Sequence, residues 1–306
     1  MINLKRVDYK RIKENILRLK KDNELILVLK DNAYGFGVDK VFDIARACNI
    51  DRFAVNNIEE AIFLRLKDKD IEILLFGYQI NNIGFIKEYN ILPSISTEEE
   101  FNLYKGHHIK MALKYDSGMN RFGFKRINED MLLSPYITTI YTHLAKEDSG
   151  NYDIIDYVHG LALKYNKLVH VGGSIAYFYT SLPIRIGSAI YDGADSLYGN
   201  VVYVHEGKKG EEVGYEGSYT LEDDGYLAIV DVGYANGIRR EFNGEVYSHG
   251  KRFRVIGKVC MNQLFVLVDS SIKIGDIVEF YGQNITKEEF LEKNIMSNYE
   301  SLLLIL

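Results

Sequence analysis

LILVLKDNAYGFGVDKVFDIARACNIDRFAVNNIEEAIFLRLK, residues 25–67, shows the pattern that decides the fold. Short runs rich in Leu, Ile and Val alternate with segments in which apolar residues recur at helical spacing. The alternation continues over the first two-thirds of the chain and gives eight candidate strands, at residues 25–30, 52–55, 72–76, 91–96, 109–115, 137–143, 167–171 and 184–190. The candidate helices are residues 39–48, 58–67, 82–89, 97–104, 128–133, 154–165 and 174–180. Strict alternation predicts a parallel sheet, and eight strands predict closure into a (β/α)8 barrel, with a doubly wound open sheet as the alternative.

The pattern changes from about Val201 to β-type runs interrupted by glycine, such as GYLAIVDVGYANG at residues 225–237. The strongest helical pattern in this part covers residues 287–292. We therefore expect two domains, an α/β barrel over residues 1–200 and a mostly β domain over residues 201–306. Residues 1–7 are candidates to pair with the β domain.

Composition excludes several classes of protein. The 306 residues are 47% hydrophobic and carry a net charge of −6 without blocks of like charge, so a nucleic-acid binder is not expected. Apolar runs are much shorter than the roughly 18 residues that a membrane span needs, and the charged start of the chain has no signal-peptide pattern, so we expect a cytoplasmic protein. Cys48 and Cys260 are too few and too far apart for a zinc knuckle or a disulfide framework, and no metal site is predicted.

Residues just after each barrel strand are the first candidates for chemistry, because barrel enzymes use the carboxyl ends of their strands. Lys30 follows five apolar residues, so its amine is expected to be partly desolvated and able to form an imine, although a solvated strand-end lysine is the simpler interpretation. The turns GGS at 172–174 and IGS at 186–188 could let backbone amides approach a phosphate, or could be ordinary turns. A lysine facing a phosphate site indicates pyridoxal phosphate.

The segment LILVLKDNAYGFG resembles the cofactor-lysine motif of the alanine racemase family, pyridoxal-phosphate enzymes of fold type III. The resemblance continues in order through FAVNNIEEAIFLR, LKYDSGMNRFGF, YTHLAKED, IRIGSAIYDG, EEVGYEGSYT, VDVGYANG, GKVCMNQLFVLVD and NYE. It covers nearly the whole chain and implies a barrel followed by a β domain.

The resemblance also implies a two-base mechanism. Lys30 matches the lysine that holds the cofactor and moves a proton on one face of the substrate α-carbon. Tyr234 matches the tyrosine that acts on the opposite face and comes from the partner subunit. Inversion of a stereocentre by proton exchange needs one such group on each face.

The remaining family positions assign binding roles. Arg185 matches the arginine at the pyridine nitrogen; because guanidinium only donates, this favours racemisation over decarboxylation or transamination. His143 matches the histidine beside the cofactor ring, and Arg121 the arginine that reaches the cofactor's phenolic oxygen and the substrate carboxylate. The phosphate-binding positions are matched by Tyr34, Ser174, Gly187, Ser188 and Tyr299.

Two further positions are implied by the same resemblance. Met261 matches a partner-subunit backbone donor to the substrate carboxylate, so the active form is expected to be a head-to-tail homodimer. Lys114 matches a lysine that is carbamylated in some members and then steadies Arg121.

The implied activity is interconversion of L-alanine and D-alanine, in bacteria a source of D-alanine for cell-wall peptidoglycan. Tyr299 favours alanine because a ring at that position narrows the pocket. A racemase of another small amino acid such as serine is the alternative, as is a non-catalytic protein that binds pyridoxal phosphate. Decarboxylation is disfavoured by Arg185.

Three residues depart from the family pattern. Asn236 and Asn262 stand where aspartate is usual, and Gly173 where asparagine commonly precedes the phosphate-binding serine. The chain also ends seven residues after Tyr299, earlier than is usual in the family. Each departure is expected to affect substrate entry, dimer stability or activity.

Overall fold

A computed structural model describes residues 5–304. The chain forms two compact units: a barrel unit, Tyr9–Asp192, and a β unit that joins the chain up to Asp8 with the chain from Gly193 onward. Within residues 5–304, no helix has the length and hydrophobicity that crossing a membrane requires.

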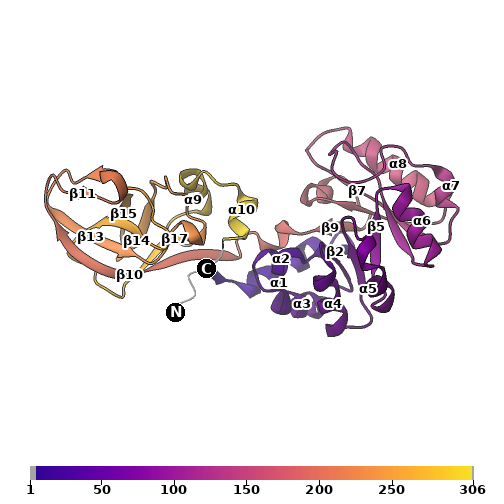
Figure 1. Cartoon of the computed structure of the whole chain (residues 1–306), viewed down its shortest axis with the longest axis horizontal. Coiled ribbons are helices and arrows are strands. Elements are labelled where there is room, and N and C mark those ends of the chain that lie inside the picture. The colour runs from indigo at the N-terminus through magenta and orange to yellow at the C-terminus, as the bar shows by residue number, and fades with distance from the viewer. Residues whose placement is uncertain (1–4, 305–306) are drawn as a thin grey trace. The chain divides into compact units, whose positions relative to one another are not determined.

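The barrel unit, drawn from indigo to pink in Figure 1, is built on a parallel sheet. Its eight strands close on themselves. Every pairing between neighbours is parallel, and β2 pairs with β9 through Leu25 with Ile184 and Leu27 with Ile186. The predicted closed barrel is therefore confirmed, and the open sheet is excluded. The strands are β2 (Leu25–Val28), β3 (Arg52–Val55), β4 (Glu72–Leu75), β5 (Leu92–Ile95), β6 (Met111–Lys114), β7 (Ile137–His143), β8 (Leu168–Gly172) and β9 (Ile184–Ile186).

Helices follow the strands, and side-chain caps set where several of them begin. The Asn57 side chain accepts the N–H of Glu60 at the start of one helix, and Thr97 forms a reciprocal capping box with Glu100 at another. The helices are α1 (Tyr9–Lys20), α2 (Lys30–Tyr34), α3 (Val38–Ala47), α4 (Ile58–Lys67), α5 (Ile83–Glu88), α6 (Glu98–Gly106), α7 (Glu129–Leu132) and α8 (Asn151–Lys164). Short 3-10 turns are η1 (Ile80–Asn82), η2 (Ser174–Phe178) and η3 (Ser188–Tyr191).

Three elements differ from the sequence-based expectation. The first strand ends at Val28, because the chain turns into α2 at Lys30. The last strand ends at Ile186, because the glycine and serine that follow begin η3. Helix α1 was not predicted, although Ile12, Ile16 and Leu19 form its buried face at helical spacing.

The β unit contains a closed antiparallel sheet. Strands β10, β13, β16, β15, β14 and β17 pair in that order, the further pairing of β10 with β17 completes the ring, and β1 adds to β10. The strands are β1 (Lys5–Val7), β10 (Asp195–Gly207), β11 (Glu212–Val213), β12 (Tyr219–Thr220), β13 (Gly225–Val230), β14 (Glu245–Ser248), β15 (Lys251–Ile256), β16 (Leu264–Val268) and β17 (Ile277–Tyr281). The short helical elements are η4 (Tyr215–Gly217), η5 (Tyr234–Asn236), α9 (Lys287–Asn294) and α10 (Asn298–Leu302).

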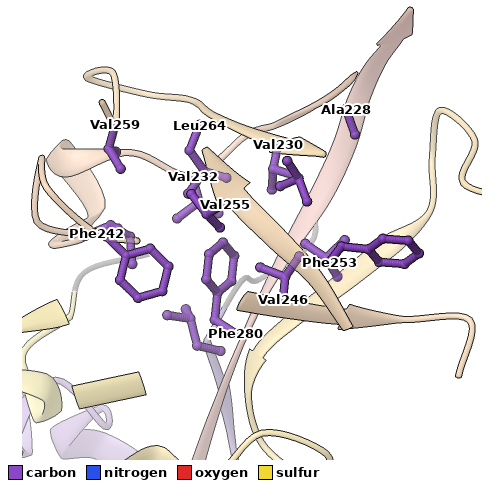
Figure 2. Close-up of a cluster of buried hydrophobic side chains, with 14 of the residues drawn as sticks. Ala228, Val230, Val232, Phe242, Val246, Phe253, Val255, Val259, Leu264 and Phe280 are labelled. Carbon is purple, nitrogen blue, oxygen red and sulfur yellow. The ribbon is translucent and has the colours of Figure 1, made fainter. Parts of the chain in front are cut away.

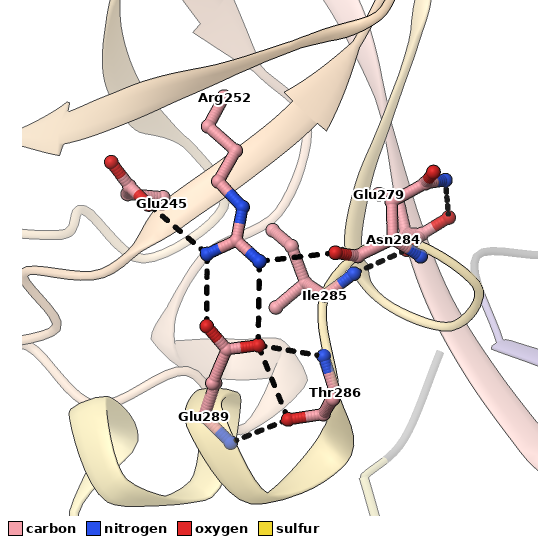
Figure 3. A network of polar contacts seen from close by, with 7 residues as sticks. All are labelled: Glu245, Arg252, Glu279, Asn284, Ile285, Thr286 and Glu289. Atoms are coloured by element: carbon pink, nitrogen blue, oxygen red, sulfur yellow. Dashed lines mark hydrogen bonds and ion pairs between the residues drawn. The ribbon is translucent and has the colours of Figure 1, made fainter.

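Apolar side chains fill the β unit and polar contacts fix its helix α9. Figure 2 shows Phe242 and Phe280 among buried valines such as Val246. Figure 3 shows Arg252 of β15 donating to both carboxylate oxygens of Glu289, at 2.8 and 3.4 Å. Because Glu289 also belongs to the capping box of α9, this bidentate contact ties the start of the helix to the sheet.

Candidate active site

The turn that follows β2 is left-handed. Asp31, Asn32, Ala33 and Tyr34 have φ values of 54°, 53°, 54° and 55°, so α2 is one turn of left-handed helix built without glycine. This conformation costs L-residues roughly 1–2 kcal/mol each, less for Asn and Asp. Backbone bonds within the turn offset part of that cost, including the Ala33 N–H to the Leu29 carbonyl at 3.0 Å.

Lys30 begins this turn, and its side chain is 36% exposed, with Nζ 3.7 Å from Asp31 Oδ2 and 5.7 Å from the centre of the Tyr34 ring. About two-thirds of the surface of this side chain is therefore covered, and the rest is open to water. The five apolar residues before Lys30 are buried in the barrel wall, but the turn carries the lysine side chain to the barrel mouth, where water reaches it.

Arg185 is the middle residue of β9, and only 5% of its surface is exposed. Its guanidinium lies between the rings of Tyr141, 4.6 Å from the ring centre, and Phe76, 5.2 Å away. Nη1 donates to His170 Nδ1 at 2.8 Å. A Cβ at Gly172 would stand 2.1 Å from Nη2, so only glycine leaves room for this side chain. The position of Arg185 is thus fixed by contacts with two aromatic rings, by a hydrogen bond to His170 and by the space that Gly172 leaves.

His170 is a residue that sequence reasoning missed. Burial, and then the charge of Arg185, hold its pKa well below the ordinary histidine value. The imidazole is therefore neutral, and Nδ1 accepts the hydrogen bond from Arg185. The signal in the sequence was a histidine inside the apolar strand LVHVG, two residues before Gly172.

Four positive side chains act on His143 at the end of β7. Burial lowers its pKa to about 3, and the charges of Arg185, Arg121, Lys114 and Lys30 contribute in that order. His143 is therefore neutral near pH 7 and can accept a hydrogen bond. An excess of positive charge around a mostly buried group favours an anionic ligand.

Lys114 belongs to the same cluster. Burial, then repulsion from Arg121 and Arg185, lowers its pKa to about 8, and Asp116 opposes this only in part. Arg121 itself is exposed, on the loop after β6. Asp116 Oδ1 accepts the N–H groups of Gly118 and Asn120, at 3.1 Å each, which orders that loop.

Hydroxyl groups gather beyond β8 and β9. Ser174 Oγ and Ser188 Oγ lie 3.3 Å apart, and a Cβ at Gly187 would stand 2.2 Å from the Tyr34 hydroxyl. Gly173 has a φ of 110°, and a Cβ there would stand 2.9 Å from the Leu144 carbonyl oxygen. Glycine at 173, the departure from the family's usual asparagine, therefore suits the local backbone.

The β unit carries the remaining predicted site residues. Tyr234 opens η5 and is 42% exposed, and Met261 is 54% exposed. The N–H of Tyr234 donates to the Cys260 carbonyl at 3.0 Å, and Asn236 Oδ1 accepts the N–H of Gly233 at 3.0 Å. Tyr234 and Met261 are therefore held near each other by adjoining turns of the β unit.

Tyr299 lies on α10 and is 68% exposed. Lys5 donates from Nζ to the Leu302 carbonyl at 2.5 Å, at the end of the same helix. The predicted site residues thus form one group around Arg185 within the barrel unit, a second at Tyr234 and Met261 within the β unit, and a single residue on α10.

Comparison with known proteins gives consistent results. The family description "Alanine racemase, N-terminal domain" matches residues 7–194, and "Alanine racemase, C-terminal domain" matches residues 194–305. An alanine racemase of Streptococcus uberis is 29% identical and aligns with 98% of this chain and 94% of its own length.

Solved structures share the fold. The alanine racemase from Bartonella henselae with covalently bound pyridoxal phosphate has a TM-score of 0.87 at 23% identity, covering 98% of this chain and 96% of that one. A histidine racemase from Leuconostoc mesenteroides has a TM-score of 0.83 at 23% identity, covering 99% and 95%.

Proposed function

The chain belongs to the alanine racemase family, and from that premise we propose that it interconverts L-alanine and D-alanine with pyridoxal 5'-phosphate as cofactor. The observation that carries the proposal is the group of four positive side chains that act on His143, of which Arg185 and Lys114 are buried and Arg121 and Lys30 are open to water. We place this activity in the cytoplasm, as a source of D-alanine for peptidoglycan.

The residues of the barrel unit fit the cofactor. Lys30 is accessible for imine formation. The hydroxyls of Tyr34, Ser174 and Ser188, with the backbone at Gly187, suit a phosphate group. Arg185 offers guanidinium donors to a pyridine nitrogen.

Each proposed role follows from the chemistry of the side chain. Bound pyridoxal phosphate supplies an electron-withdrawing ring that makes the α-proton of an attached amino acid easier to remove. Lys30 takes or returns that proton on one face, and Tyr234 on the other. Arg185 keeps its own proton, because even its lowered pKa of about 10 leaves it charged at neutral pH. It therefore gives no proton to the ring, which favours return of the proton to the α-carbon.

Substrate positioning is assigned to two residues. Arg121 binds the substrate carboxylate by a charge-assisted contact, and Met261 adds a backbone donor. In this proposal a carbamylated Lys114 steadies Arg121. Its pKa of about 8 makes the neutral amine, the form that reacts with carbon dioxide, accessible at mildly alkaline pH.

The active form in this proposal is a homodimer. Tyr234 and Met261 act in the partner's site, which agrees with their exposure in a single chain. Asn236 keeps the hydrogen bond to Gly233 that orders the Tyr234 turn, so the loss of a carboxylate at this position leaves the turn intact.

A racemase of another amino acid is the second candidate, because the histidine racemase shows that this fold serves other substrates. Size discrimination supplies only about 1 to 3 kcal/mol per methylene, so activity on serine is the first alternative to measure. Retention of both Lys30 and Tyr234 argues against a non-catalytic binding protein.

The test is the absorbance spectrum of the purified protein, followed by deuterium exchange at the α-carbon of each alanine enantiomer in heavy water. We expect a yellow protein that labels both enantiomers, and loss of both properties in Lys30→Ala. Lys10→Ala, at an exposed lysine of α1, is the matched control. Yellow colour without exchange into any small amino acid would refute the racemase, and absence of colour with added cofactor would refute the cofactor.

A further inference from the structure

The Glu60 carboxylate bridges two backbone groups at the base of the left-handed turn. Oε1 accepts the N–H of Asp31 at 2.5 Å, and Oε2 accepts the N–H of Asn56 at 3.1 Å. The backbone N–H of Glu60 donates to the Asn57 side chain at 2.8 Å. The carboxylate is thus held at the first turn of α4 and reaches the residue that follows Lys30.

Asp31 is the first left-handed residue of α2. The backbone hydrogen bonds described for the turn come from N–H groups after Asp31: the Ala33 N–H donates to the Leu29 carbonyl and the Gly35 N–H to the Asp31 carbonyl. Glu60 therefore supplies an acceptor to an N–H at the point where the chain changes hand. Bonds to a carboxylate are stronger than neutral ones, so this contact favours a turn that L-residues otherwise avoid.

The handedness of the turn decides where two proposed site residues point. Lys30 is the first residue of α2 and Tyr34 is its last, and Lys30 Nζ lies 5.7 Å from the centre of the Tyr34 ring. The Tyr34 hydroxyl in turn approaches the Gly187 backbone. If Asp31 changed to a right-handed conformation, the chain after it would run in another direction and the Tyr34 hydroxyl would move.

We propose that Glu60 is a positioning residue that clamps the left-handed turn and thereby aims Lys30 and Tyr34. The clamp deepens the proposed function and rests on that function, because the proposed function gives Lys30 and Tyr34 their roles. The carboxylate acts through the backbone of Asp31 and does not touch the reacting atoms.

The experiment compares Glu60→Ala and Glu60→Gln with Glu59→Ala and Glu59→Gln. Glu59 is the matched control, since it is an exposed carboxylate in the same helical turn. The first readout is hydrogen exchange in the full chain, before and after addition of pyridoxal phosphate, followed in a peptide that begins before Asp31 and covers residues 27–37. We expect about 10- to 100-fold faster exchange at Asp31 in Glu60→Ala, a smaller rise in Glu60→Gln, which keeps one acceptor oxygen, and no change in either Glu59 variant.

The second readout is pyridoxal phosphate affinity, expected to fall about tenfold in Glu60→Ala with a circular dichroism spectrum like that of the native chain. Exchange and affinity that match the Glu59 variants would overturn the clamp. If Glu60→Ala does not fold, the same comparison is made with Glu60→Gln. Native values of both hydrogen exchange at Asp31 and pyridoxal phosphate affinity in that variant would overturn the clamp. A native chain that neither binds the cofactor nor racemises alanine would refute the proposed function, while exchange at Asp31 would still decide the clamp.

Discussion

Gly187→Ala tests the phosphate site through one steric contact. The new Cβ would stand 2.2 Å from the Tyr34 hydroxyl, whereas ordinary contact begins at 3.4 Å. The hydroxyl must therefore retreat by about 1 Å. A hydrogen bond from it to a phosphate, normally about 2.7 Å long, would stretch beyond useful length.

The size of the effect follows from the bond that is lost. A hydrogen bond to a charged group contributes about 1.5–3 kcal/mol, and every 1.4 kcal/mol is tenfold in affinity, so pyridoxal phosphate should bind about 10- to 100-fold more weakly. Tyr34→Phe removes the same bond and should give a similar loss. The double variant should then bind no more weakly than Tyr34→Phe alone.

The assay is equilibrium dialysis with pyridoxal phosphate, with pyridoxal as the ligand that lacks the phosphate. Pyridoxal should bind all variants alike. Gly84→Ala is the control substitution, because a Cβ at Gly84 would have no atom within 4 Å. An affinity of Gly187→Ala for pyridoxal phosphate equal to that of the native chain would refute the reasoning. Additive losses of affinity in the double variant would also refute it, because Gly187→Ala would then act by a route other than Tyr34.

Three other predictions concern buried or capping groups. Burial lowers the pKa of Lys5 from 10.5 to about 8. Between those pH values the folded protein therefore holds fewer protons than the unfolded chain. The free energy of unfolding should accordingly rise by about 3 kcal/mol as the pH increases across this window. Urea unfolding at pH 8 and 10 should show a clearly smaller rise in Lys5→Met than in the native chain, and the rise that remains comes from Lys114, whose pKa is lowered to the same range. His170→Phe leaves a buried Arg185 donor without its acceptor, so it should lower the free energy of unfolding by about 1–3 kcal/mol and weaken cofactor binding. An unchanged melting temperature would contradict the contact between Arg185 and His170. Asn236→Asp should preserve α-proton exchange. Asn236→Ala should slow exchange from one alanine enantiomer more than from the other, because in the proposed mechanism Tyr234 acts on one face; equal slowing of both would argue against that role.

The barrel was predictable because local pattern and burial agree there. The helix at Ile58–Lys67 and the strand at Ile137–His143 lie where the apolar periodicity places them. By contrast, IRIGSAI was expected to be one strand, since periodicity does not show that Gly187 and Ser188 end it.

The local geometry of the site was less predictable. The left-handed conformation of Ala33 and Tyr34 has no sequence signal, because neither residue favours it and contacts from outside the turn hold it. The Glu60 contact joins residues 29 positions apart, and the bond from Arg185 to His170 depends on the register of two strands. Motif resemblance named most candidates, and only the structure shows which contacts hold them.

The pairing of β1 with β10 has a consequence for synthesis on the ribosome. Lys5 pairs with Leu197, so the first strand of the sheet must wait for a partner that is translated about 190 residues later. At about 5–20 residues per second this interval is roughly 10–40 s. During that time the whole barrel unit is translated, while β1 stays without its partner strand. The β unit can therefore be completed only after the segment that forms the barrel unit has been translated, because it combines residues from both sides of that segment.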